Sequence, residues 1–157
     1  MTAVPPRVYR LQDIGPRVHV RFGLGAEHEE HRRASGAIVP PPLDFVALLD
    51  TGASLTFLPP DSFARLGVQP TGETPVLAAG APRRPYPTYI GRLTFRGTAG
   101  DVSLVARTAE LPDLEAGTAI VGRDTLAHGR LVYDGREGAV ALALKGIEIP
   151  TLDPMAE

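Results

Sequence analysis

The sequence predicts an all-β fold with one or two short helices, and three observations carry this prediction. Apolar and polar residues alternate in segments such as 17–24, as they do in half-buried strands. Glycine (17 residues) and proline (16 residues) are frequent and spread along the chain, which suits short strands joined by turns. Residues 130–144 have the pattern of a hairpin with its turn at 134–138.

The elements of the first half follow from their local patterns. Residues 25–36 are polar and bounded by glycines, which predicts an exposed hairpin or loop. Residues 37–50 hold two apolar pieces around a proline bend, and the second piece is apolar enough to form a buried strand. Residues 55–67 predict a short helix that begins near Pro60 and ends at Gly67.

The second half continues in the same way. Residues 75–95 predict a long hairpin whose tip consists of small residues, and residues 100–111 predict another strand. A further apolar strand leads through Gly122 into about one helical turn, which Gly129 ends.

The composition predicts an ordinary globular domain. The 157 residues fit one domain, with its core at about 8–146 and tails at 1–6 and 148–157. A net charge of −2 gives no reason to expect nucleic acid or a membrane surface as partner. The absence of cysteine excludes disulfides, thiolate metal sites and a cysteine nucleophile. We expect a cytoplasmic protein, because no segment has the pattern of a signal peptide or membrane span.

The segment LLDTGAS, residues 48–54, carries the chemistry. An apolar strand leads into it and delivers Asp50 to a tight turn, followed by Thr51 and Gly52. A plain surface turn explains Asp-Thr-Gly alone, since aspartate and glycine are common in turns. It does not explain why a buried strand should end in a single carboxylate.

Two motifs together resemble those of a known protein family. Residues 48–54 resemble the active-site loop of aspartic proteases, and residues 119–126, AIVGRDTL, resemble the element that precedes a short helix in retropepsins, the retroviral type. The resemblance spans about residues 40–134. It implies a closed barrel or sandwich with a flap hairpin and one half-site per chain. The extra hairpin that follows resembles cellular and bacterial members more than the compact viral enzymes.

The resemblance implies roles for individual residues. Asp50 supplies a catalytic carboxylate, Thr51 fixes the geometry by a hydrogen bond to the opposing loop, and Gly52 lets backbone approach. The substrate-binding candidates are Ala53 and Ser54 beside the loop and Ala79, Gly80 and Ala81 at the flap tip. The candidates for structural support are Ile120, Val121, Gly122, Arg123 and Asp124. We expect Arg123 to bind Asp124 or a main-chain carbonyl, and Asp124 to cap the short helix rather than to react.

The number of Asp-Thr-Gly motifs in the chain predicts the assembly. Peptide hydrolysis needs one group that takes a proton and one that gives it, and two carboxylates sharing a proton do both. The chain has a single Asp-Thr-Gly, so the second carboxylate must come from another copy. This implies a two-fold symmetric homodimer that cleaves an extended protein or peptide segment without cofactor. Two alternatives stay open: a dimer of this fold that only binds or scaffolds peptides, and a peptidase that first removes its own tail.

The remaining polar motifs have ordinary explanations. His28 and His31 lie three apart among glutamates, whereas a zinc-binding HExxH motif sets them four apart, so a solvated loop is the better interpretation. The short basic stretches stand in a net acidic chain and do not indicate nucleic-acid binding.

Overall fold

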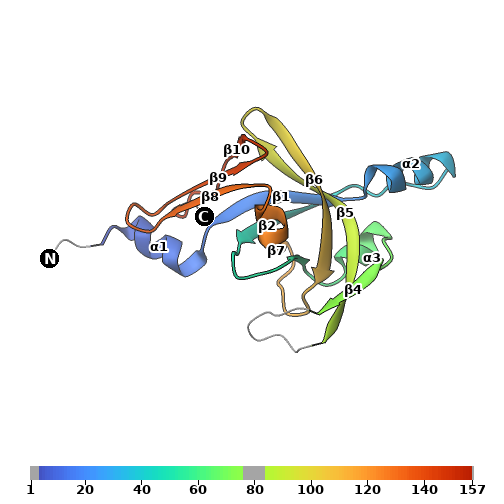
Figure 1. The fold of residues 1–157 in the computed structure, drawn as a ribbon, viewed down its shortest axis with the longest axis horizontal. Coiled ribbons are helices and arrows are strands. Elements are labelled where there is room, and N and C mark those ends of the chain that lie inside the picture. Colours follow the sequence, from blue (N-terminus) through green and yellow to red (C-terminus); the bar gives the residue numbers. More distant parts are fainter. Residues whose placement is uncertain (1–3, 76–83, 157) are drawn as a thin grey trace.

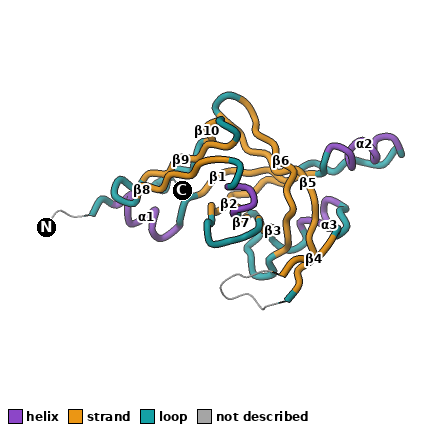
Figure 2. Tube along the Cα trace, viewed as in Figure 1, coloured by secondary structure: helices purple, strands orange, loops and turns teal. Residues whose placement is uncertain are grey.

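The computed structural model describes residues 4–75 and 84–156 of the chain. The strands in these ranges are β1 (Arg17–Gly23), β2 (Leu43–Leu49), β3 (Thr56–Leu58), β4 (Gly72–Pro75), β5 (Pro85–Gly97), β6 (Gly100–Glu110), β7 (Thr118–Val121), β8 (Gly129–Asp134), β9 (Ala139–Leu144) and β10 (Ile147–Ile149). The helices are α1 (Pro6–Ile14), α2 (Ala26–Ala34), α3 (Ser62–Leu66) and α4 (Arg123–Leu126). Strands fill the middle of the molecule, and α1 and α2 lie at opposite ends of its long axis (Figures 1 and 2).

The main sheet closes on itself into a barrel. Its strands follow in the order β1-β2-β7-β3-β6-β5-β4, and β1 also pairs with β5, which joins the sheet across its ends. The strand β4 extends beyond this closure and pairs with β5 alone among the described strands. The prediction of an all-β fold built on a closed barrel is therefore confirmed.

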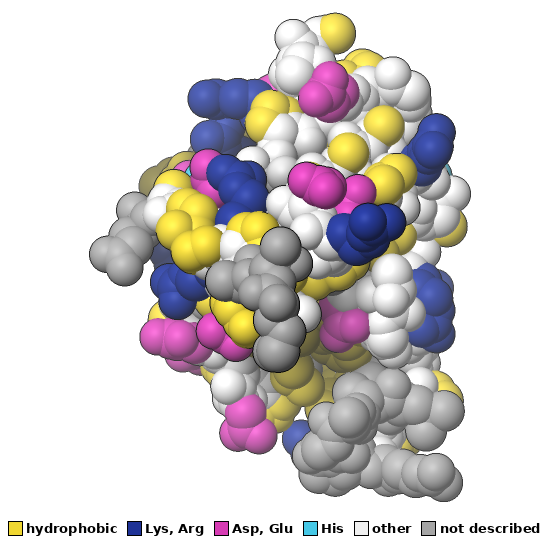
Figure 3. All heavy atoms as spheres, turned by 90° about the vertical axis from the view of Figure 1, so that its left-hand side faces the viewer, with side chains coloured by type: hydrophobic (Ala, Val, Ile, Leu, Met, Phe, Trp, Pro, Cys, Tyr) yellow, Lys and Arg dark blue, Asp and Glu magenta, His cyan; other side chains and the backbone are white. Residues whose placement is uncertain are grey.

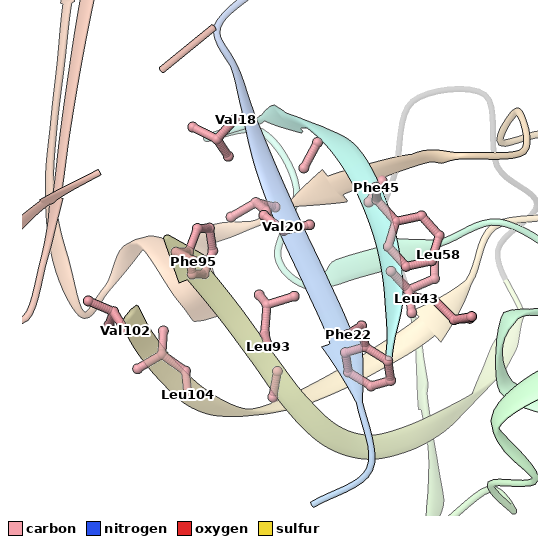
Figure 4. Close-up of a cluster of buried hydrophobic side chains, with 14 of the residues drawn as sticks. Val18, Val20, Phe22, Leu43, Phe45, Leu58, Leu93, Phe95, Val102 and Leu104 are labelled. Carbon is pink, nitrogen blue, oxygen red and sulfur yellow. The ribbon is translucent and has the colours of Figure 1, made fainter. Parts of the chain in front are cut away.

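Alternating side chains fill the barrel. Along β1, residues at every second position are buried, because successive side chains in a strand point to opposite faces. The inward-facing side chains of β1, β2, β5 and β6 meet in one cluster with Leu58 of β3 (Figure 4). The residues labelled there are Val18, Val20, Phe22, Leu43, Phe45, Leu58, Leu93, Phe95, Val102 and Leu104. Burying this surface is the main favourable contribution to folding.

Parallel pairings bring the two sequence motifs together. β2 and β7 run parallel, with Leu49 opposite Val121, so the carboxyl ends of both strands lie at the same end of the barrel. The short β3 pairs with β7 at Phe57 and Ile120 and runs parallel to β6 on its other side. The loop after β2 and the helix after β7 therefore become neighbours, although about 70 residues separate them in sequence.

A second sheet, in the order β10-β9-β8, lies against the barrel. The hairpin β8–β9 has the turn predicted at residues 134–138, where two main-chain N–H groups donate to Asp134 Oδ1. After β10 the chain returns to β1, where Thr151 forms a bridge with Val18. At the same end of the molecule, Arg7 of α1 forms an ion pair of 2.8 Å with Asp153.

The loop expected at residues 25–36 is instead the helix α2, so this prediction was wrong. The helix buries no side chain, and its apolar content gave no periodic signal. Acidic residues lie in its first turn and basic residues in its last, which suits the helix dipole. Glu29 also forms ion pairs with Arg33 (3.1 Å) and with Arg92 of β5 (2.7 Å). This helix is therefore attached to the barrel by polar contacts and not by a buried apolar face.

The other helices also differ in part from expectation. α1 was not predicted, and α3 begins at Ser62 rather than near Pro60, because Asp61 has a φ of 68° and lies outside the helix. Only the second apolar piece of residues 37–50 forms a strand. None of the helices in the described ranges has the length and apolar character that crossing a membrane requires.

Candidate active site

Strand β2 places Asp50 at one end of the barrel. Its buried residues alternate with more exposed ones, and Asp50 follows its last residue directly. The Asp50 N–H donates to the carbonyl of Val121 at 2.9 Å, which extends the pairing of β2 with β7 by one residue. The backbone of Asp50 is therefore fixed by the sheet, while its side chain is only partly buried.

The turn after Asp50 fixes the position of the carboxylate through a main-chain hydrogen bond. The Gly52 N–H donates to Asp50 Oδ1 at 2.8 Å, and the Ala53 N–H donates to the Asp50 carbonyl at 3.2 Å. A Cβ on Gly52 would lie 3.0 Å from Asp50 Oδ1, so a side chain there would press on the carboxylate. Thr51 and Gly52 are exposed at the tip of the turn. The segment thus presents one ordered carboxylate beside an exposed hydroxyl residue.

The second motif anchors this turn through Arg123. Its guanidinium Nη1 donates to the Thr51 carbonyl at 2.7 Å, and its main-chain N–H donates to the Ala53 carbonyl at 2.9 Å. Of the two partners considered for Arg123, the structure therefore shows a main-chain carbonyl. Two bonds from one residue clamp both sides of the turn that carries Asp50.

A small apolar cluster supports the turn from behind. Ala53 is 6% exposed and belongs to this cluster, with Phe57, Tyr86 and Ala109, and Ile120 packs against it. Val121 is fully buried in the main core, and Ser54 is partly exposed beside the turn. The Ala53 side chain thus faces the interior of the chain, and Ser54 has the more accessible side chain of the two.

The flap prediction falls partly outside the described residues. β4 and β5 pair as the predicted hairpin, with Pro75 opposite Pro85 as the last pair. Ala79, Gly80 and Ala81, the predicted tip, lie outside the described residues.

The similarity of the chain to known proteins agrees with this geometry. The family model described as aspartyl protease matches residues 42–125, which is more than half of the chain and includes the first motif and all but the last residue of the second. The chain belongs to the aspartyl protease family. The resemblance drawn from residues 48–54 and 119–126 is thereby confirmed. A comparison with curated proteins gives no match.

Two solved structures are similar to this family member. One is the retroviral protease-like domain of Ddi1 from Leishmania major, with 15% identity and a TM-score of 0.45, covering 89% of this chain and 97% of that one. The other is EIAV protease complexed with the inhibitor HBY-793, with 24% identity and a TM-score of 0.32, covering 55% of this chain and 76% of that one.

A buried polar network lies beneath the aspartyl protease loop, and the motif analysis missed its centre, Thr56. Its hydroxyl donates to Asp124 Oδ1 at 3.0 Å and accepts from the Gly122 N–H at 3.3 Å. It also lies 3.0 Å from the Thr125 hydroxyl. Both threonines are buried. The available signal was a hydroxyl residue inside the apolar segment LTFL and a second one between Asp124 and Leu126, since buried polar groups need partners.

Replacing Thr56 by valine tests this network. Valine keeps the shape but leaves the Gly122 N–H and the Asp124 carboxylate without this partner, so we expect a loss of about 1–3 kcal/mol in the free energy of unfolding. Thr88→Val is the matched control, because Thr88 is equally buried and its hydroxyl has no hydrogen-bond partner among the described residues. Urea titration of both variants measures the effect. An equal loss in both would show that the Thr56 hydroxyl contributes nothing specific.

Burial raises the pKa of the Asp124 carboxyl. Desolvation raises the pKa of its carboxyl above the ordinary 3.8, and hydrogen bonds from the Thr125 N–H and the Thr56 hydroxyl partly oppose that rise. The Asp124 side chain is therefore partly buried under the loop and contacts Thr56 rather than the exposed turn. The structure does not show the expected cap, because Gly122 is at the N-cap position of α4 and no side-chain cap hydrogen bond forms there.

The raised pKa gives Asp124→Asn a defined pH dependence. Between the unfolded and the raised folded pKa, the folded state binds the proton more strongly. The stability that Asp124 contributes is thus fully present below its unfolded pKa and is lost as the pH rises through its folded pKa. We expect the free energy of unfolding of the wild type, minus that of Asp124→Asn, to increase from pH 7 to pH 4. Urea titrations at both pH values measure it, and a constant or decreasing difference would contradict this assignment.

Proposed function

We propose that this chain is an aspartic endopeptidase that acts as a homodimer. One observation carries the proposal: the loop fixes a single carboxylate, Asp50, at an exposed turn, and the chain has no second Asp-Thr-Gly to complete a pair. Membership of the aspartyl protease family supports the reaction type. A second copy, related by a two-fold axis, would supply the partner carboxylate.

The proposed mechanism divides two proton transfers between the paired Asp50 side chains. The ionised carboxylate takes a proton from water as the water oxygen bonds to the scissile carbonyl carbon. The protonated carboxyl gives its proton to the carbonyl oxygen, which forms a tetrahedral intermediate with two hydroxyl groups. The carboxyl that took the proton from water then passes it to the amine nitrogen as the C–N bond breaks, and the other carboxylate takes a hydroxyl proton back as the new carboxylic acid forms. Two carboxylates held close together share one proton, because both cannot be ionised at low cost. Positioned proton transfer of this kind accounts for about 10²–10⁴-fold in rate.

The other residues of the loop have supporting roles in this proposal. Thr51 is exposed next to Asp50, where its hydroxyl is available to the loop of the second copy. The Gly52 N–H already binds Asp50 Oδ1 and so orients the carboxylate. Ser54 lies beside the turn, where an extended substrate would pass. The hairpin of β4 and β5 would act as the flap that covers this substrate through backbone pairing.

Cleavage of a diverse peptide mixture tests this function. The wild type and Asp50→Asn are incubated with the mixture from pH 4 to 7, at concentrations that favour dimers, and products are identified by mass spectrometry. We expect cuts at defined sequences from the wild type alone. A folded dimer that binds peptides without cutting them would favour a peptide-binding module instead. Equal cuts from both proteins would place the reaction elsewhere or in a contaminant.

A further inference from the structure

A cavity of about 500 Å³ lies on the outer face of the barrel, where β1 and β5 separate. β1 pairs with β5 only from Arg21 to Gly23, whereas β5 continues beside β6 as far as Gly97. Pockets that hold small ligands have volumes of about 300–1,000 Å³. Asp44, which lines the cavity, is six residues from Asp50 along β2, a distance of about 20 Å in a strand. The cavity is therefore separate from the proposed catalytic site.

The cavity borders a short unpaired stretch of the β1 edge. On the side of β1 that faces away from β2, the Leu152 N–H donates to the Arg17 carbonyl at 2.8 Å, and pairing with β5 begins at Arg21. Between these contacts, His19 pairs with β2 alone among the described strands. Alternate residues of a strand present their main-chain N–H and C=O groups to the same side, so those of His19 point toward the cavity that it lines. Pro150 on the opposite wall has no N–H to bond them.

Two opposite charges beside this edge have no partner within the described part of the chain. Arg96 of β5 and Asp101 of β6 face each other across the strand pair, and both line the cavity. Their side chains nevertheless form neither an ion pair nor a hydrogen bond with any described residue. The other ion pair at the cavity is already made, since Arg21 binds Asp44 at 3.0 Å. One positive and one negative group therefore remain available to a ligand.

These features favour a ligand that is short, carries both charges and has a peptide backbone. A ligand of a single sign would meet a like charge at either Arg96 or Asp101. The unpaired edge from Val18 to Arg21 is about 10 Å long, because each residue of a strand adds about 3.3 Å. A longer extended chain would collide at its ends with Thr151 and with β5, which already occupy the edge of β1. A peptide of two or three residues with free termini meets all three requirements.

We propose that this cavity binds a short zwitterionic peptide, whose carboxylate bonds to Arg96 and whose ammonium bonds to Asp101. An amide of the peptide pairs with the main-chain groups of His19, as in the addition of a strand to the edge of a sheet. The charge-assisted bonds at the two termini select a free peptide over an internal segment of a longer chain. The site goes beyond the proposed peptidase and does not depend on it, because Asp50 takes no part in it.

Isothermal titration calorimetry with trialanine tests the site. We expect saturable binding to the wild type, and binding about tenfold weaker for N-acetyl-trialanine and for trialanine amide, which each lack one terminal charge. In Arg96→Gln, trialanine should bind about tenfold more weakly, and amidation of the peptide should no longer matter. In Asp101→Asn, the affinity should fall similarly, and acetylation should no longer matter. Such a crossed pattern assigns each peptide terminus to one side chain.

Arg10→Gln is the matched control for Arg96→Gln. Arg10 lines a different cavity, of about 450 Å³, beside α1. The end of the molecule that carries α1 faces the viewer in Figure 3, where apolar side chains lie among charges of both signs. Both substitutions remove one positive charge from an exposed arginine, so they change the net charge equally. The affinity of Arg10→Gln for trialanine should stay within about twofold of wild type, because distant exposed charges are screened.

The main-chain amide signal of His19 tests the pairing with β1. In an NMR titration of the wild type with trialanine, this signal should shift, and under the same conditions it should shift much less in Arg96→Gln. Equal affinity of the wild type and Arg96→Gln would place the peptide elsewhere and overturn the proposal. The absence of saturable binding, or equal binding of the capped peptides, would overturn it as well. None of these outcomes affects the proposed peptidase, which the Asp50→Asn experiment tests separately.

Discussion

Asp50→Asn is expected to reduce peptide cleavage by at least about 10³-fold while the fold and the dimer persist. Asparagine is nearly the same size as aspartate, and its Oδ1 still accepts the hydrogen bond from the Gly52 N–H. It cannot take a proton from water, so the proposed dyad loses its function without losing its geometry. Initial rates on a peptide that the wild type cuts, together with sedimentation equilibrium, measure both parts of this expectation.

Asp44→Asn is the matched control for this variant. Asp44 lies on the same strand, β2, but its side chain is 75% exposed and pairs with Arg21. The control should retain nearly full activity, because an exposed ion pair contributes little to stability. Full activity in Asp50→Asn would contradict the proposed mechanism, and an equal loss in both variants would point to a general effect on β2.

Mixed dimers extend the same prediction to the assembly. If the two Asp50 side chains form one site, a dimer with one asparagine lacks the pair. In an equal mixture of wild type and Asp50→Asn that exchanges subunits freely, only about one quarter of the dimers carry two aspartates. Activity should therefore fall to about a quarter of that of the same total concentration of wild type. A fall to one half would instead indicate that each subunit works alone.

Gly122→Ala is expected to cost about 3 kcal/mol of folding free energy and to inactivate the protein. The backbone at Gly122 has a φ of −93°, which alanine adopts readily, so strain of the dihedral is not the reason. A Cβ at this position would collide with the Leu55 carbonyl and lie 3.0 Å from the Ala53 carbonyl. Both carbonyls belong to the chain just after Asp50, so relief of the collision must move the loop that carries Asp50.

Gly25→Ala serves as the control for this substitution. Gly25 has a φ of −66° and no atom within 4 Å of the position that a Cβ would take. For a chain of this size, a loss of about 3 kcal/mol corresponds to a decrease in Tm of roughly 6–12 °C. Thermal denaturation of both variants measures the difference. A Tm within 2 °C of wild type for Gly122→Ala, a threshold small beside that expectation, would show that the loop accommodates the methyl group.

The sequence predicted the strands better than the helices, for an identifiable reason. Strands that line the barrel bury every second residue, so β1 and β6 leave a clear alternating pattern. The helix α2 has no apolar face, and its position depends on Glu29 reaching Arg92 across the barrel surface. A search of the sequence detects apolar periodicity. An ion pair between two charged residues that lie 63 positions apart produces no such periodicity.

The sequence by itself determined the family and the candidate reacting group, because Asp-Thr-Gly after a buried strand and the later Gly-Arg-Asp element are local patterns. Only the tertiary structure decided how these patterns meet. The parallel pairing of β2 with β7 brings Arg123 to the Thr51 carbonyl, and the pairing of β3 with β7 brings Thr56 to Gly122 and Asp124. Such contacts depend on the order of strands around the barrel, which is set by the burial of the whole core. No window of sequence contains that information.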